Sequence, residues 1–149
     1  MAIIDKTKTK KPYIEDRDED TFIGIDLPFH RGDYEGYFAS TMTVRDAVKV
    51  NIRNLLQTEL GERVFQPNLG VKLRRFLFEP FTDETKMAIQ NSIIDTFSFW
   101  LPFVNIVKVT VNMHESTSNI DNNTLKVFVE FSLKKDPETI ESVQLNIGE

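Results

Sequence analysis

The stretch that decides the fold is Leu125-Lys126-Val127-Phe128-Val129-Glu130-Phe131-Ser132-Leu133. Every second residue from Leu125 to Leu133 is apolar, and Lys126, Glu130 and Ser132 fall between them. A period of two is typical of a strand that has one buried face and one face toward solvent. The stretch therefore predicts a half-buried β-strand.

The same period extends to both sides of this strand. Two more runs show it: Val107, Val109, Val111 and Met113 upstream, and Val143, Leu145 and Ile147 downstream. The links are a polar loop from Glu115 to Asn123 and a turn at Asp136-Pro137-Glu138. Consecutive strands with short links pair antiparallel. Together with a shorter alternating run from Phe22 to Leu27, these runs predict an antiparallel sheet of three to five strands.

Two amphipathic helices are predicted ahead of these strands. Thr43, with Asp46 three residues later, is placed to cap the first helix, and Gly61 is placed to stop it. Thr82 caps the second helix, and Pro102 ends it because the residue before a proline avoids the helical region. The apolar stripes are Val44, Ala47, Val48, Ile52, Leu55 and Leu56 in the first, and Ile89, Ile93, Ile94, Phe97, Trp100 and Leu101 in the second. The pattern predicts an α+β fold with both helices packed on one face of the sheet.

The chain is predicted to hold one domain and an arm. Its 149 residues fit a single core. Residues 1–20 are polar and charged, and such a segment cannot bury enough apolar surface to offset the entropy lost on ordering. We therefore expect a flexible N-terminal arm over residues 1–20 and the domain over residues 21–149.

The composition excludes several classes of function. The absence of cysteine rules out disulfides, thiolate zinc sites and cysteine nucleophiles. The net charge of −5 has the wrong sign for a dedicated nucleic-acid binder. The sequence has neither the ~18-residue apolar run of a membrane-spanning helix nor a signal peptide. We expect a soluble protein that stays where it is made, with no nucleic-acid, membrane or small-molecule partner.

The acidic residues suggest one enzymatic alternative, a two-carboxylate glycosidase. Its candidates are Glu59, Glu62 and Glu79, near the segment between the two helices. With 23 acids in the chain, however, pairs within reach of each other are expected by chance. We therefore predict no catalytic residue, and the glycosidase stays as an alternative.

Two residue patterns suggest metal sites, and neither is complete. Asp16, Asp18 and Asp20 have the first spacings of an EF-hand loop, but the glycine and the final glutamate of that loop are missing. His30 and His114 are single imidazoles far apart in the sequence. The prediction is that the chain holds no metal and no cofactor.

The segment between the helices is long for a bare connection in a compact domain. It runs Gly61-Glu62-Arg63-Val64-Phe65-Gln66-Pro67-Asn68-Leu69-Gly70-Val71-Lys72-Leu73-Arg74-Arg75-Phe76-Leu77-Phe78-Glu79-Pro80. Gly61 and Gly70 permit unusual backbone angles, and its arginines present forked donors that suit carboxylates. Two interpretations remain open: a docking element for a partner, or a folded connection whose arginines pair with local acids.

The chain resembles the baseplate wedge and sheath-initiator family of contractile phage tails. The residues that carry the resemblance are Thr43, Gly61-Glu62-Arg63, Pro67-Asn68-Leu69-Gly70, Leu73-Arg74, Leu77-Phe78-Glu79-Pro80 and Trp100-Leu101-Pro102. Asp136-Pro137-Glu138-Thr139-Ile140-Glu141 is similar to the T-even branch in particular. The resemblance covers nearly the whole chain from about Phe22.

The resemblance implies a structural protein of the tail baseplate in the virion, present six times per ring and assembled in the host cytoplasm. The implied partners are the wedge scaffold, the sheath protein and the tail tube. Scaffold docking is expected at Glu62, Arg63, Pro67, Leu73, Arg74, Arg75 and Pro102. Pairing with sheath strands is expected at Val143, Leu145 and Ile147, where main-chain hydrogen bonds would give affinity and alternating side chains would fix the register.

One departure and one alternative accompany this resemblance. Many members have Glu-Pro-Arg around the proline after the second helix, whereas this chain has Leu101-Pro102-Phe103. The charged contact that the family pattern implies is therefore missing here. The alternative within the family is a type VI secretion baseplate or another contractile injection particle.

Overall fold

The computed structural model describes residue 13 and residues 22–32, 37–114 and 124–148. The chain divides into two compact units, Met1–Val50 and Asn51–Glu149, and each is described here by itself. The predicted arm over residues 1–20, including Asp16, Asp18 and Asp20, lies outside the described residues except for Tyr13. The polar loop from Glu115 to Asn123 also lies outside them.

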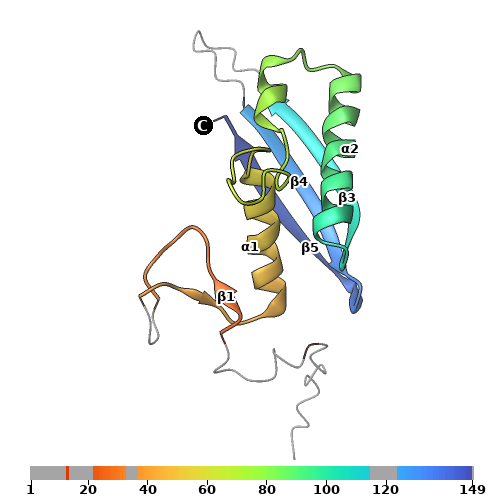
Figure 1. Ribbon diagram of the computed structural model, residues 1–149. Coiled ribbons are helices and arrows are strands. Elements are labelled where there is room, and N and C mark those ends of the chain that lie inside the picture. Colours follow the sequence, from red (N-terminus) through yellow and green to blue (C-terminus); the bar gives the residue numbers. More distant parts are fainter. Residues whose placement is uncertain (1–12, 14–21, 33–36, 115–123, 149) are drawn as a thin grey trace, which may run out of the picture. The chain divides into compact units, whose positions relative to one another are not determined.

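The second unit is built on a three-stranded antiparallel sheet (Figure 1). Its strands are β3 (Val104–His114), β4 (Thr124–Leu133) and β5 (Asp136–Ile147), in the order β3-β4-β5. The alternating apolar residues of the central strand, from Leu125 to Leu133, are all buried. The predicted strands and their antiparallel pairing are confirmed.

The register of β3 changes near its start, and this corrects one prediction. Ile106 pairs with Phe131 and Lys108 with Glu130, so Val107 is an extra residue in β3 without a partner in β4. A bulge of this kind shifts which residues face the core. Val107, expected on the buried face, is therefore 49 % exposed, whereas Val109 and Val111 are buried as predicted.

The two predicted helices are present. They are α1 (Val44–Gln57) and α2 (Asp83–Trp100), with a short 3-10 helix, η2 (Arg74–Phe78), between them. The Thr82 hydroxyl accepts the Thr85 N–H at 3.2 Å, which confirms the predicted cap of α2. The first turn of α1 is closed by a bond of 3.2 Å from the Asp46 N–H to the Thr43 hydroxyl.

One face of the sheet is covered by α2 and the last turns of α1 (Figure 1). Ile89, Ile93 and Phe97 of α2 are buried, as the stripe predicts. Ile94 was expected in the same stripe but is exposed, because it lies one position to the side of the buried row. The α+β fold is confirmed, with its core between this face of the sheet and the helices.

The first unit contains a second, smaller sheet. Its strands, β1 (Gly24–Ile25) and β2 (Ser40–Thr41), pair antiparallel, so the alternating run from Phe22 to Leu27 contributes only two residues to a strand. Bonds of 2.9 Å from the Ile23 N–H to the Thr41 carbonyl and from the Asp26 N–H to the Ala39 carbonyl extend the pairing. Among the described residues, no helix has the length and apolar character that crossing a membrane requires.

Candidate functional site

The segment between α1 and α2, residues 58–82, is folded and is called the connector below. The Gly61 N–H donates to the Pro67 carbonyl at 2.8 Å, which closes a loop. The Val71 N–H then donates to the Thr58 carbonyl at 2.9 Å, which brings the chain back to the end of α1. Gly70 has φ +119°, and a Cβ there would lie 2.2 Å from the Thr58 oxygen. The close approach of the two backbone segments thus requires glycine.

Polar side chains hold the connector in this shape. The Glu62 carboxylate accepts the Glu59 N–H at 2.9 Å, and the Glu59 carboxylate accepts the Arg74 N–H at 3.0 Å. The Arg63 guanidinium donates to the Asn54 side-chain oxygen of α1 at 3.1 Å. Glu62 and Arg63, two of the predicted docking residues, therefore serve the fold of the connector itself.

The connector buries some of its apolar side chains and exposes others. Val71, Leu73 and Leu77 are buried, so the side chain of Leu73, a predicted docking residue, is enclosed by the protein itself. Val64 and Phe65, in contrast, are 88 % and 97 % exposed at the tip of the closed loop. We call these two residues the connector tip. The sequence alone does not separate Val64 and Phe65 from the buried residues of the connector, because exposed and buried residues of one type look alike in a sequence.

The remaining predicted docking residues lie at two separate places. Pro67, Arg74 and Arg75 are exposed on the connector, where the Arg75 Nε lies 3.5 Å from the Glu79 carboxylate. Pro102 lies beyond the opposite end of α2, and a helix of 18 residues is about 27 Å long. The structure therefore brings most of the predicted docking set together but leaves Pro102 apart.

The predicted sheath-pairing residues lie inside the molecule. Val143, Leu145 and Ile147 are buried on the face of β5 that is turned to the helices. Ser142, Gln144 and Asn146 alternate with them and are exposed on the other face. In the part of the chain that the structure describes, β5 pairs only with β4, so its outer edge can offer main-chain groups to a further strand.

A hollow of ≈ 630 Å³ adjoins the C-terminal end of β5 and is called the β5 hollow below. Its lining comes from three segments that are distant in sequence: Leu56 and Gln57 of α1, Glu59, Arg74 and Leu77 of the connector, and Asn146, Ile147 and Gly148 at the end of β5. The hollow thus joins Arg74, a predicted docking residue, to Ile147, a predicted pairing residue. Their proximity could not be predicted from the sequence, in which they are more than seventy positions apart.

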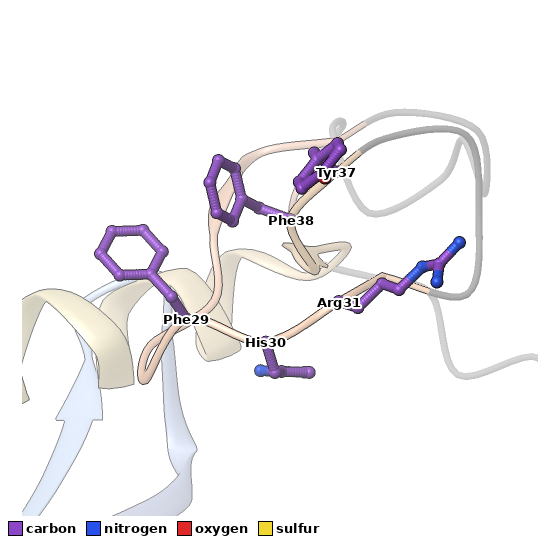
Figure 2. Close-up of a pocket in the computed structure, with 5 residues that line it drawn as sticks. All are labelled: Phe29, His30, Arg31, Tyr37 and Phe38. Atoms are coloured by element: carbon purple, nitrogen blue, oxygen red, sulfur yellow. The ribbon is translucent and has the colours of Figure 1, made fainter.

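The first unit has an aromatic hollow of its own, of ≈ 360 Å³ (Figure 2). The ring centroids of Phe29 and Phe38 are 5.3 Å apart, and those of Tyr37 and Phe38 are 6.0 Å apart. His30 and Arg31 complete the lining. The sequence does not predict this hollow, since its aromatic residues have no strand or helix period.

Four residues that the sequence suggests for catalysis or metal binding make structural contacts in the described part of the chain: Glu59, Glu62, Glu79 and His30. Glu59 and Glu62 accept backbone N–H groups in the connector, and Glu79 pairs with Arg75. The His30 ring nitrogen Nδ1 lies 2.9 Å from the Pro28 carbonyl. The described residues contain no cluster of three His, Asp or Glu side chains suited to a metal.

Comparison with protein families gives one match that spans most of the chain. Residues 42–138 match the family described as Baseplate wedge protein gp25. The matched region begins just before α1 and extends through the connector, α2, β3 and β4 into β5.

One relative carries the same description as this family, and two solved structures share the fold. The Baseplate wedge protein gp25 of Enterobacteria phage T4 is 28 % identical over 102 residues, which are 68 % of this chain and 74 % of the relative. A crystal structure from Geobacter sulfurreducens with the provisional name tail lysozyme aligns with a TM-score of 0.60 and 21 % identity, over 71 % of this chain and 91 % of that chain. A chain of the anti-feeding prophage baseplate aligns with a TM-score of 0.59 and 24 % identity, over 72 % and 82 %.

Proposed function

The chain belongs to the baseplate wedge protein family, and from this membership we propose that it docks on the wedge scaffold of a contractile phage tail and initiates the sheath. In this proposal one strand of a sheath subunit pairs with β5. Six copies act per baseplate, and they are assembled in the host cytoplasm. The role is structural, without catalysis, and a contact with the tail tube is part of the proposal.

The outer edge of β5 is the observation that carries this proposal. β5 is a terminal strand of the sheet, so its outward N–H and C=O groups are available for pairing with another chain. Its buried residues Val143, Leu145 and Ile147 already fill the core. The three contribute by fixing the position of the edge, and the contact itself is made by the main chain.

The connector supports the second half of the proposal, docking on the scaffold. Apolar side chains such as those of the connector tip are normally buried, and exposed ones often mark interaction surfaces. The loop that carries Val64 and Phe65 is held by the Gly61–Pro67 and Arg63–Asn54 bonds. Because the loop is already ordered, little entropy is lost when it binds.

Single cysteines can test both halves of the proposal, since the chain has none of its own. Gln144→Cys places a thiol on β5, Gln66→Cys places one beside the connector tip, and Asp95→Cys places a control on the exposed side of α2. In assembled particles treated with a short thiol-to-amine cross-linker, we expect Gln144→Cys to join the sheath protein and Gln66→Cys to join a scaffold subunit. If Gln144→Cys and Asp95→Cys gave the same products, sheath pairing at β5 would be refuted.

Two alternatives have distinct outcomes. A baseplate of type VI secretion or of another contractile particle would give the same cross-links, but to the sheath and scaffold of that machine. A cell-wall glycosidase would release sugar fragments from purified peptidoglycan, and Glu59→Gln or Glu62→Gln would abolish the release. We expect no release from the unmodified chain, because both carboxylates are bonded to backbone N–H groups in the connector.

A further inference from the structure

The lining of the β5 hollow combines three apolar residues with one cation, Arg74, and one carboxylate, Glu59. Leu56, Leu77 and Ile147 contribute the apolar part of its lining, and Arg74 contributes the positive charge. Figure 1 shows the C-terminal end of β5 beside the connector, where these segments meet. The hollow therefore lies at the same edge of the sheet that the proposed function gives to the sheath.

The Arg74 guanidinium shares the hollow with the Glu59 carboxylate but is not ion-paired with it in the part of the chain that the structure describes. The Arg74 backbone N–H is bonded to Glu59, but none of the described carboxylates forms an ion pair with its guanidinium. The next residue differs, since the Arg75 Nε lies 3.5 Å from Glu79. Two adjacent arginines on one short helix thus have different surroundings, and only Arg74 lines the hollow.

A strand added to the outer edge of β5 would lie beside the end of β5 that lines this hollow. Neighbouring strands lie about 4.8 Å apart, and side chains of paired residues point to the same face of the sheet. Ile147 faces the helices and lines the hollow. The side chain of the residue paired with Ile147 would therefore enter the hollow and approach Arg74.

We propose that the β5 hollow receives an Asp or Glu side chain of the strand that pairs with β5, and that Arg74 binds its carboxylate. The inference rests on the proposed function, because strand pairing is what brings this side chain to the hollow. Strand pairing alone would depend only on main-chain groups. The proposed contact also requires the partner strand to have an acidic residue at the position opposite Ile147.

The charge of Glu59 should affect binding of the carboxylate in the opposite direction to the charge of Arg74. Its carboxylate lines the same hollow and accepts the Arg74 N–H at 3.0 Å. A like charge near an incoming carboxylate weakens binding. Glu59→Gln keeps an oxygen that can accept this N–H and removes the charge, so it should strengthen binding where Arg74→Gln weakens it.

The test measures binding of the purified sheath subunit of the same particle to the immobilised full-length chain. We expect Arg74→Gln to weaken binding about three- to tenfold, which is the range for a partly enclosed charged contact. Lys72→Gln is the control, because Lys72 is an exposed cation of the connector that does not line the hollow, and it should leave binding unchanged. Glu59→Gln should strengthen binding by about twofold. Thermal unfolding of each variant shows whether the fold is preserved.

The outcomes separate the inference from the proposed function. If the unmodified chain does not bind the sheath subunit, the proposed function fails and the inference fails with it. If it binds and Arg74→Gln binds equally well, or if Arg74→Gln and Lys72→Gln weaken binding alike, the inference alone is overturned. A charge swap gives a further test: Arg74→Glu is combined with a sheath variant in which one acidic residue is replaced by lysine. If the two variants bind each other, the pairing is supported and the acidic residue is identified.

Discussion

The connector and β5 both contain many apolar residues, but the connector exposes side chains to solvent and β5 exposes main-chain groups. The connector exposes side chains, with Phe65 97 % exposed at its tip. β5 buries its apolar side chains and offers the main chain of its edge. Apolar content in a sequence therefore does not say whether a segment serves the core or a partner.

The difference has a consequence for how the two contacts are specified. A side-chain contact depends on the identity of one or two residues at its centre. A main-chain contact tolerates many side chains and takes its specificity from neighbouring pockets. Substitutions at the connector tip should therefore weaken the connector's contact with its partner. The contact made by β5 should instead respond to substitutions of its core residues and of the residues that line the hollow at its end.

The largest expected effect is on the buried side of β5. Leu145 is 3 % exposed, so Leu145→Ala removes core packing and should lower the free energy of unfolding by about 3 kcal/mol. Chemical denaturation followed by circular dichroism measures this change. Gln144→Ala, next to it on the exposed face, is the control and should change stability by about 0.5 kcal/mol or less. Similar losses for both variants would contradict the inward orientation of Leu145.

A somewhat smaller effect is expected where the connector returns to α1. Gly70→Ala combines a positive φ with a Cβ 2.2 Å from the Thr58 oxygen, and should cost about 2–3 kcal/mol. Gly61→Ala is the matched variant, since Gly61 has φ +91° but open space around a Cβ. It should cost only about 1 kcal/mol. Equal costs in the same denaturation experiment would show that the close approach is relieved by movement of the connector.

Most of the fold could be predicted because its signals are local. The alternation in β4 and β5, the threonine cap at Thr82 and the helix stripes each follow from neighbouring residues, and the structure confirms them except for Ile94, which is exposed. The failures have non-local causes. The bulge at Val107 depends on the register of β3 against β4, and the second small sheet depends on pairing between Gly24–Ile25 and Ser40–Thr41.

The candidate site was predicted less completely, for a related reason. The sequence indicates the connector and several of its residues, but it does not separate residues that hold the loop, such as Arg63, from residues that the loop exposes, such as Phe65. It also could not place Arg74 beside Ile147 in one hollow. Both distinctions depend on how the chain folds back on itself.

The smallest effect on stability, and the sharpest test of the comparison, is expected at the connector tip. Phe65→Ala removes a side chain that is 97 % exposed, so the free energy of unfolding should change by about 0.5 kcal/mol or less. Incorporation of the variant into baseplates should nevertheless fall strongly, because an exposed aromatic residue on an ordered loop is the kind of anchor that dominates an interface. Quantification of the chain in purified particles measures this. Phe78→Ala, at another exposed phenylalanine of the connector, is the matched control. If both variants entered particles as the unmodified chain does, the exposed side chains of the connector would have no part in docking, and the contrast with β5 would lose its functional meaning.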